Sequence, residues 1–111
     1  MGGKFSHDNK IWNVEPLWEL SKDLPVFEVA PNSLKEWNIH VWSDRQSLGS
    51  IAEHTRRINE ADLNCPIILS AEGHIMDGCH RLIKAYLSGV NVKCVQFEVT
   101  PPHDRDIKTE L

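Results

Sequence analysis

The sequence predicts a single α+β domain in which helices flank a small mixed β-sheet. Three observations support this prediction. The chain has 111 residues, enough for one modest hydrophobic core. Short β-branched runs bounded by turn residues alternate with two segments of helical period, which is typical of mixed helix and strand. The composition, 41% hydrophobic and 25% charged, is that of an ordinary globular protein.

The ends of the chain differ in character from its middle. Residues 1–10 are polar and contain two glycines, so we expect them to be flexible. Residues 11–100 carry the periodic segments and are predicted to form the domain. Residues 101–111 begin with two prolines and are rich in charge, which predicts an exposed tail.

The first elements are short. From Ile11 the sequence "IWNVEPLWELS" predicts a strand and then a helical turn that begins at Pro16, because proline is favoured at the first helical position. The β-branched run "PVFEVA", residues 25–30, lies between prolines and predicts a second strand. The segment "NSLKEWN" follows and predicts a helical turn capped by Asn32 or Ser33.

A longer helix is predicted from Ser50 to Asp62. Ser50 and Glu53 have the spacing of a capping box, in which the two side chains bond to free backbone donors. Apolar positions follow at intervals of three or four residues, which gives an apolar stripe of helical period. The stripe comprises Leu48, Ile51, Thr55, Ile58 and Ala61; the polar residues His54, Arg56, Arg57 and Glu60 lie off it.

The second half of the chain has clearer element boundaries. Two short strands, residues 67–70 and 74–76, are predicted on either side of a turn at Gly73. The next segment, "CHRLIKAYLS", has helical period, with Asp77 or Gly78 at its N-cap and Gly89 just past its end. The run "NVKCVQFEV" predicts the last strand.

Charge and cysteine content restrict the function. A net charge of −4 argues against a whole-domain electrostatic grip on DNA. The three cysteines form no C-x-x-C pair, so neither a zinc ribbon nor a thioredoxin-type site is predicted. Unpaired cysteines, and the lack of a long apolar segment, lead us to expect a cytoplasmic protein without membrane contact.

The sequence "DGCHR", residues 77–81, predicts an anion site. A helix N-terminus presents unpaired backbone N–H groups and the positive end of the helix dipole. Gly78 would let a ligand approach the backbone, while His80 and Arg81 can donate to phosphate oxygens. Lys84 shares a helix face with Arg81, and the fold could bring Arg56 and Arg57 alongside. We therefore expect a small phosphorylated ligand rather than a long polyanion.

Two neighbouring residues have more than one interpretation. Cys79 beside two cations at a helix N-terminus is expected to have its pKa lowered from about 8.5 to 7 or below, which would make it a nucleophile. The alternative is a buried cysteine under Leu82 and Ile83. Asp77 can be a helix N-cap, a magnesium-associated carboxylate or a general base. His74, His80 and Cys79 lack a second ligand pair, so zinc is not expected.

The segment "PIILSAEGHIMDGCHRLIKAYLSGVNVKCVQF" resembles the core of the ParB/sulfiredoxin superfamily. The family pattern is a strand, a turn, a second strand and then a Gly-x-x-Arg or Gly-Cys-His-Arg turn that opens a helix. About a third of the chain matches it well. The matching positions are Pro66, Gly73, Asp77, Gly78, His80, Arg81, Ala85 and Gly89.

The resemblance implies a nucleotide site at this turn, for ATP as in sulfiredoxins or CTP as in ParB proteins, with magnesium. It leaves three functions open. The first is an enzyme that uses Cys79 for ATP-dependent phosphoryl transfer or sulfinic-acid reduction. The second is a non-catalytic, nucleotide-responsive module with a protein partner in a partition or defence assembly. The third is a nuclease accessory with a metal held by Asp77. Only residues 98–111 follow the core, so autonomous DNA binding is not expected.

Overall fold

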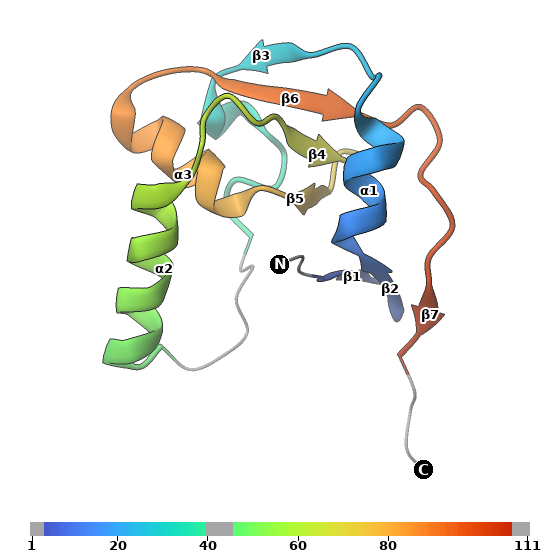
Figure 1. Cartoon of the computed structure of the whole chain (residues 1–111), viewed down its shortest axis with the longest axis horizontal. Helices are drawn as coiled ribbons and strands as arrows, with labels where there is room; N and C mark the ends of the chain where they lie inside the picture. The colour runs from blue at the N-terminus through green and yellow to red at the C-terminus, as the bar shows by residue number, and fades with distance from the viewer. Residues whose placement is uncertain (1–3, 40–45, 108–111) are drawn as a thin grey trace.

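The computed structural model describes residues 4–39 and 46–107 and has the predicted α+β class (Figure 1). Its main sheet has four strands in the order β3-β6-β4-β5. Strands β4 (Ile67–Leu69) and β6 (Val92–Gln96) are parallel neighbours at the centre. At the edges, strand β3 (Phe27–Val29) pairs antiparallel with β6, and strand β5 (Ile75–Asp77) pairs antiparallel with β4. The predicted mixed sheet is therefore confirmed.

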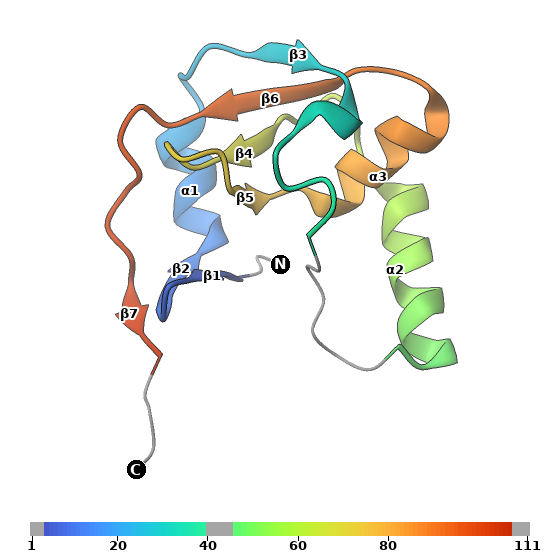
Figure 2. The same cartoon turned by 180° about the vertical axis from the view of Figure 1, so that it is seen from behind.

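Both faces of this sheet are covered, because successive side chains of a strand point to opposite sides. Helix α3 (Cys79–Ser88) contributes Leu82 and Ala85 to a core with Ile67 and Cys94. On the other face, Leu17 of helix α1 (Val14–Ser21) packs in a core that comprises Trp12, Ile68, Met76, Val95 and Phe97. Figures 1 and 2 show α1 and α3 toward opposite ends of the sheet.

A second, three-stranded sheet differs from the flexible N-terminus expected from the sequence. Strand β1 (Lys4–His7) pairs antiparallel with β2 (Lys10–Asn13), and β2 pairs with β7 (Arg105–Asp106) of the C-terminal segment. Asp8 and Asn9 have φ of 51° and 62°, the positive values that a two-residue hairpin loop requires. Phe5 packs on its cross-strand partner Trp12 with ring centroids 5.3 Å apart, and Trp12 belongs to the core of the main sheet, which holds the hairpin on the domain. Residues 1–3 and 108–111 lie outside the described residues.

Helix α2 (Leu48–Glu60) starts earlier than predicted. Its N-cap is Ser47, whose Oγ accepts a hydrogen bond from the Ser50 N–H at 3.0 Å. Ser50 therefore lies inside the first turn, and the capping box of Ser50 with Glu53 is wrong. The apolar stripe is not buried in the structure, because α2 has no buried residue and Leu48 is 89% exposed. In Figures 1 and 2 this helix lies beside α3 and projects away from the main sheet.

Two smaller differences concern helix starts. Helix α1 begins at Val14, so Pro16 is its third residue and not its first. The short 3₁₀ helix η1 (Pro31–Ser33) has Ala30 at its N-cap, and neither Asn32 nor Ser33 caps it. Within residues 4–39 and 46–107, no helix is long and apolar enough to cross a membrane.

Candidate functional site

The predicted anion site lies where β5 ends and α3 begins. Gly78 occupies the N-cap of α3 with φ 114° and ψ 21°, a conformation that L side chains rarely adopt. A Cβ at this position would lie 2.4 Å from Cγ2 of Ile67 in the neighbouring strand. The glycine is therefore required by backbone conformation and by close packing on β4. The space on the side where a Cβ would stand is filled by Ile67.

Arg81 is held mainly by the protein itself. Its Nη1 donates to the Pro66 carbonyl at 2.6 Å and to the Cys65 carbonyl at 3.2 Å, while Nη2 donates to Oδ2 of Asp77 at 2.7 Å. The side chain is 18% exposed. These bonds fasten the first turn of α3 to the segment that leads into β4. The guanidinium therefore has a structural role in joining these two segments. The sequence had suggested only a role as a phosphate ligand.

Asp77 forms bonds that connect two helices. Its Oδ2 accepts from Arg81 and from Nε1 of Trp18 on α1, the latter at 2.9 Å. Gly78, not Asp77, is the N-cap residue, and no side chain caps that end of α3. The N-cap interpretation of Asp77 is therefore wrong. Trp18 was not foreseen as its partner, because nothing in the sequence relates positions 59 residues apart.

Cys79 is the clearest departure from the expected chemistry. Burial raises the pKa of its thiol to about 11, and the negative charges of Asp77 and Glu36 act in the same direction. The nearby charge of Arg81 lowers the pKa but is outweighed. The side chain packs against the core that contains Leu82. The expected lowering of the pKa to 7 or below is wrong, because desolvation dominates over the cationic neighbours.

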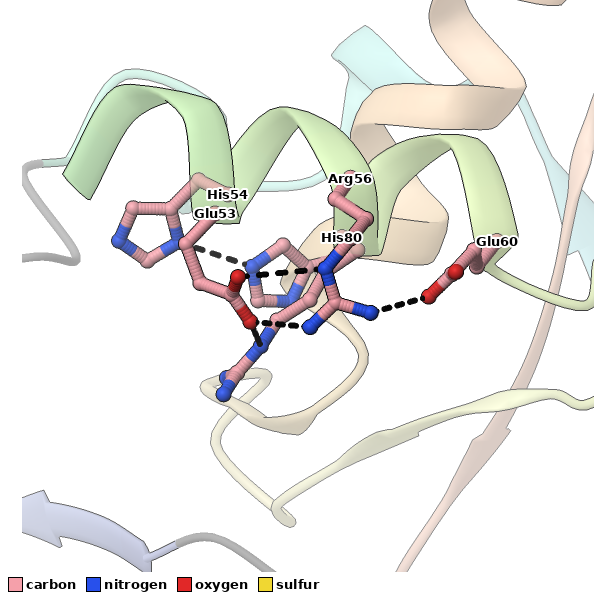
Figure 3. A network of polar contacts seen from close by, with 6 residues as sticks. Glu53, His54, Arg56, Glu60 and His80 are labelled. Carbon is pink, nitrogen blue, oxygen red and sulfur yellow. Dashed lines mark hydrogen bonds and ion pairs between the residues drawn. The ribbon is translucent and has the colours of Figure 1, made fainter. Parts of the chain in front are cut away.

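His80, in contrast, meets helix α2 as the charge pattern suggested. Nε2 of His80 lies 3.0 Å from Nδ1 of His54, and the two rings are stacked with centroids 5.3 Å apart. Figure 3 shows the two imidazoles facing each other from α3 and α2. Burial is the largest cause that lowers the pKa of His80. The charges of His54, Arg57 and Arg81 lower this pKa further, and the negative charge of Asp77 raises it. Positive charges from both α2 and α3 therefore act on this imidazole, in addition to its burial.

The two adjacent arginines of α2 have different surroundings. Arg56 pairs with both Glu53 and Glu60, as Figure 3 shows, and the hydrogen bonds that it donates to Glu53 are the largest cause that raises its pKa. Arg57 pairs with Glu53, with Nε and Oε1 separated by 3.3 Å. Arg57 is also the one of the two whose charge lowers the pKa of His80. Arg57 thus joins the histidine pair, whereas Arg56 belongs to the exposed ion pairs of the helix.

Lys84 is the last predicted ligand, and it too is engaged by the protein. Its Nζ donates to the Ala61 carbonyl at 2.7 Å and to the Asn59 carbonyl at 2.9 Å. A lysine that bonds the last carbonyls of a helix satisfies acceptors that have no partner within the helix. Lys84 therefore fastens the C-terminal end of α2 to α3, away from the start of α3.

The predicted site residues therefore have different roles: Arg81 and Lys84 bond to backbone carbonyls of the protein, whereas His80 contacts His54. In the part of the chain that the structure describes, no group of three or more His, Cys, Asp or Glu side chains could hold a metal ion. Comparisons with protein-family models, with curated proteins and with solved structures find no match to this chain. The candidate anion site comprises His80 and His54, which are in contact, and Arg57, whose charge acts on His80.

Proposed function

We propose that this domain binds the phosphates of a nucleoside triphosphate beside the start of α3, as a non-catalytic module of a larger assembly of the partition or defence type. The observation that carries the proposal is the contact of His54 of α2 with His80 of α3, together with the charge of Arg57, which acts on the same imidazole. These side chains lie at the positive end of the α3 dipole, where an anion is favoured.

The electrostatics of His80 support an anionic ligand. The positive charges that lower the pKa of His80 also attract a phosphate placed near them. A bound phosphate would in turn favour the protonated imidazole and gain a charge-assisted hydrogen bond. Magnesium would accompany ATP or CTP on the phosphate oxygens, as it usually does with triphosphates.

A binding role is favoured over catalysis through Cys79. With a pKa of about 11, only about one thiol in 10⁴ would be ionised at pH 7. Sulfinic-acid reduction or phosphoryl transfer through this thiol would therefore begin from a very small population. A nuclease that uses Asp77 is also less favoured, because the same carboxylate oxygen accepts from Arg81 and Trp18.

The test is isothermal titration of the domain with ATP, CTP and tripolyphosphate, each with magnesium. Arg57→Gln and Arg56→Gln form a matched pair, because each removes one exposed charge from the same helix. We expect Arg57→Gln to weaken binding about two- to fivefold and His80→Gln about tenfold, with Arg56→Gln close to the parent. Cys79→Ala should leave the affinity unchanged.

The proposal fails if a folded sample gives no heat with any of the three ligands, or if Arg56→Gln and Arg57→Gln act equally. Loss of a measurable turnover in Cys79→Ala would instead favour the enzymatic alternative. Arg81→Ala is a poor probe of binding, because its guanidinium holds the carbonyls of Cys65 and Pro66 and its loss would disturb the turn.

A further inference from the structure

A cavity of about 520 Å³ opens between helix α1, the segment before β4 and the main sheet. Its size lies in the range of about 300–1,000 Å³ that is usual for small-molecule sites. The apolar part of its wall comprises Trp18, Val26, Pro66, Ile68 and Val95. The cavity does not include His54, His80 or Arg57, so it is separate from the proposed phosphate site.

Trp18 gives this cavity a fixed aromatic wall. Its side chain is 45% exposed, although an indole is among the most favourable groups to bury. The indole Nε1 donates to Asp77, and Asp77 accepts from Arg81 at 2.7 Å. Because this chain of bonds holds the ring, a flat ligand could stack on it without ordering a free side chain.

The polar part of the wall offers more donors than acceptors. Arg81 lines the cavity, and its guanidinium has five N–H groups, of which the structure shows three donated to protein acceptors. Lys22 also lines the cavity, and its Nζ donates to Glu19, which leaves two of its three N–H groups. The carboxylate of Asp62 is turned to its own loop, where it accepts from the Asn64 N–H at 2.9 Å and lies 3.8 Å from Sγ of Cys65.

We infer that this cavity is a binding site for a small, flat aromatic carboxylate. The ring lies against Trp18 and the apolar wall, and the carboxylate accepts from the Arg81 N–H groups that no acceptor among the described residues takes. An aromatic amine would meet the same apolar wall but would bring donors to a site that already has an excess of them. The charge of the ligand is therefore the feature that the wall selects.

The experiment is an NMR titration of the ¹⁵N-labelled chain with three probes that share one ring system: 2-naphthoate, naphthalen-2-ylmethanol and naphthalen-2-ylmethylamine. For a ligand of this size we expect 2-naphthoate to bind with a dissociation constant of about 1 mM or tighter. The shifts should be largest at the Trp18 indole N–H and the Arg81 Nε–H. The amine should bind at least about tenfold more weakly.

Two variants and a control locate the site. Val26→Trp, at a 54% exposed position of the wall, should fill the cavity and abolish binding, and Trp18→Ala should weaken it at least about fivefold. Tyr86→Ala removes an equally exposed aromatic side chain outside the cavity and should leave binding unchanged. The inference is overturned if 2-naphthoate gives no saturable shifts in the folded chain, if the amine binds as tightly, or if Val26→Trp binds like the parent.

Discussion

The substitution Gly78→Ala gives a direct test of how β5, α3 and β4 are joined. The backbone of Gly78 has φ 114°, and an added Cβ would lie 2.4 Å from Cγ2 and 2.9 Å from Cβ of Ile67. Ile67 has 0% exposure, so it cannot turn aside into solvent. Positive φ costs a non-glycine residue about 1–2 kcal/mol, and overpacking a core adds about 1–3 kcal/mol. We expect a loss of about 3 kcal/mol.

Gly89→Ala is the matched control, since Gly89 has φ 71° and an added Cβ would meet no atom within 4 Å. It should lose only the conformational part, about 1 kcal/mol. Urea unfolding followed by circular dichroism measures both losses. With a slope of about 1–3 kcal/mol/M, the midpoint of Gly78→Ala should fall by about 1–3 M and that of Gly89→Ala by less than half as much. Equal losses in the two variants would refute the argument that Ile67 fills the space at Gly78.

Three further outcomes are expected. Because the pKa of His80 is lowered on folding, the unfolded chain binds the proton more tightly than the folded chain. The free energy of unfolding should therefore be highest above about pH 6.5 and fall toward pH 5.5. In the variant His80→Gln, the urea midpoints should depend less on pH. Lys84→Met should lower the stability by about 1–2 kcal/mol and speed amide exchange in α2, whereas unchanged exchange would contradict its role as a fastener. Exposed Cys65 should react with a disulfide reagent at least about a hundred times faster than Cys79 in the native state. The variant Cys79→Ser keeps Cys65 and the variant Cys65→Ser keeps Cys79, so the two variants report the two rates. Comparable rates would contradict the burial and the raised pKa of Cys79.

Local patterns in the sequence predicted the elements around the turn well. The apolar run before Gly73, the helical period from Cys79 and the glycine at position 89 each act within a few residues, and β4, β5 and α3 follow them. Local patterns gave a wrong helix start where two residues could each act as the N-cap. Ser47 and Ser50 can both cap a helix, and only the structure shows that the bond runs from the N–H of Ser50 to Ser47.

The hairpin of β1 and β2 shows a signal that was present but unused. Asp8 and Asn9 are residues that tolerate positive φ, and they lie between two short segments that each contain apolar residues. The composition of residues 1–10 predicted flexibility because it counts polar residues without regard to the turn that they form. The contact between Phe5 and Trp12 then supplies the packing that keeps the hairpin ordered.

The sequence alone determined which reactive and cationic groups stand at the start of α3, and that this start is a turn between a strand and a helix. The tertiary structure decided what each group does. Burial raises the pKa of Cys79, and Arg81 donates hydrogen bonds to the carbonyls of the segment before β4. Helix α2 brings His54 to His80 from 26 residues away. Desolvation and through-space charge depend on which surfaces meet in the fold, and residue spacing along one element does not specify that.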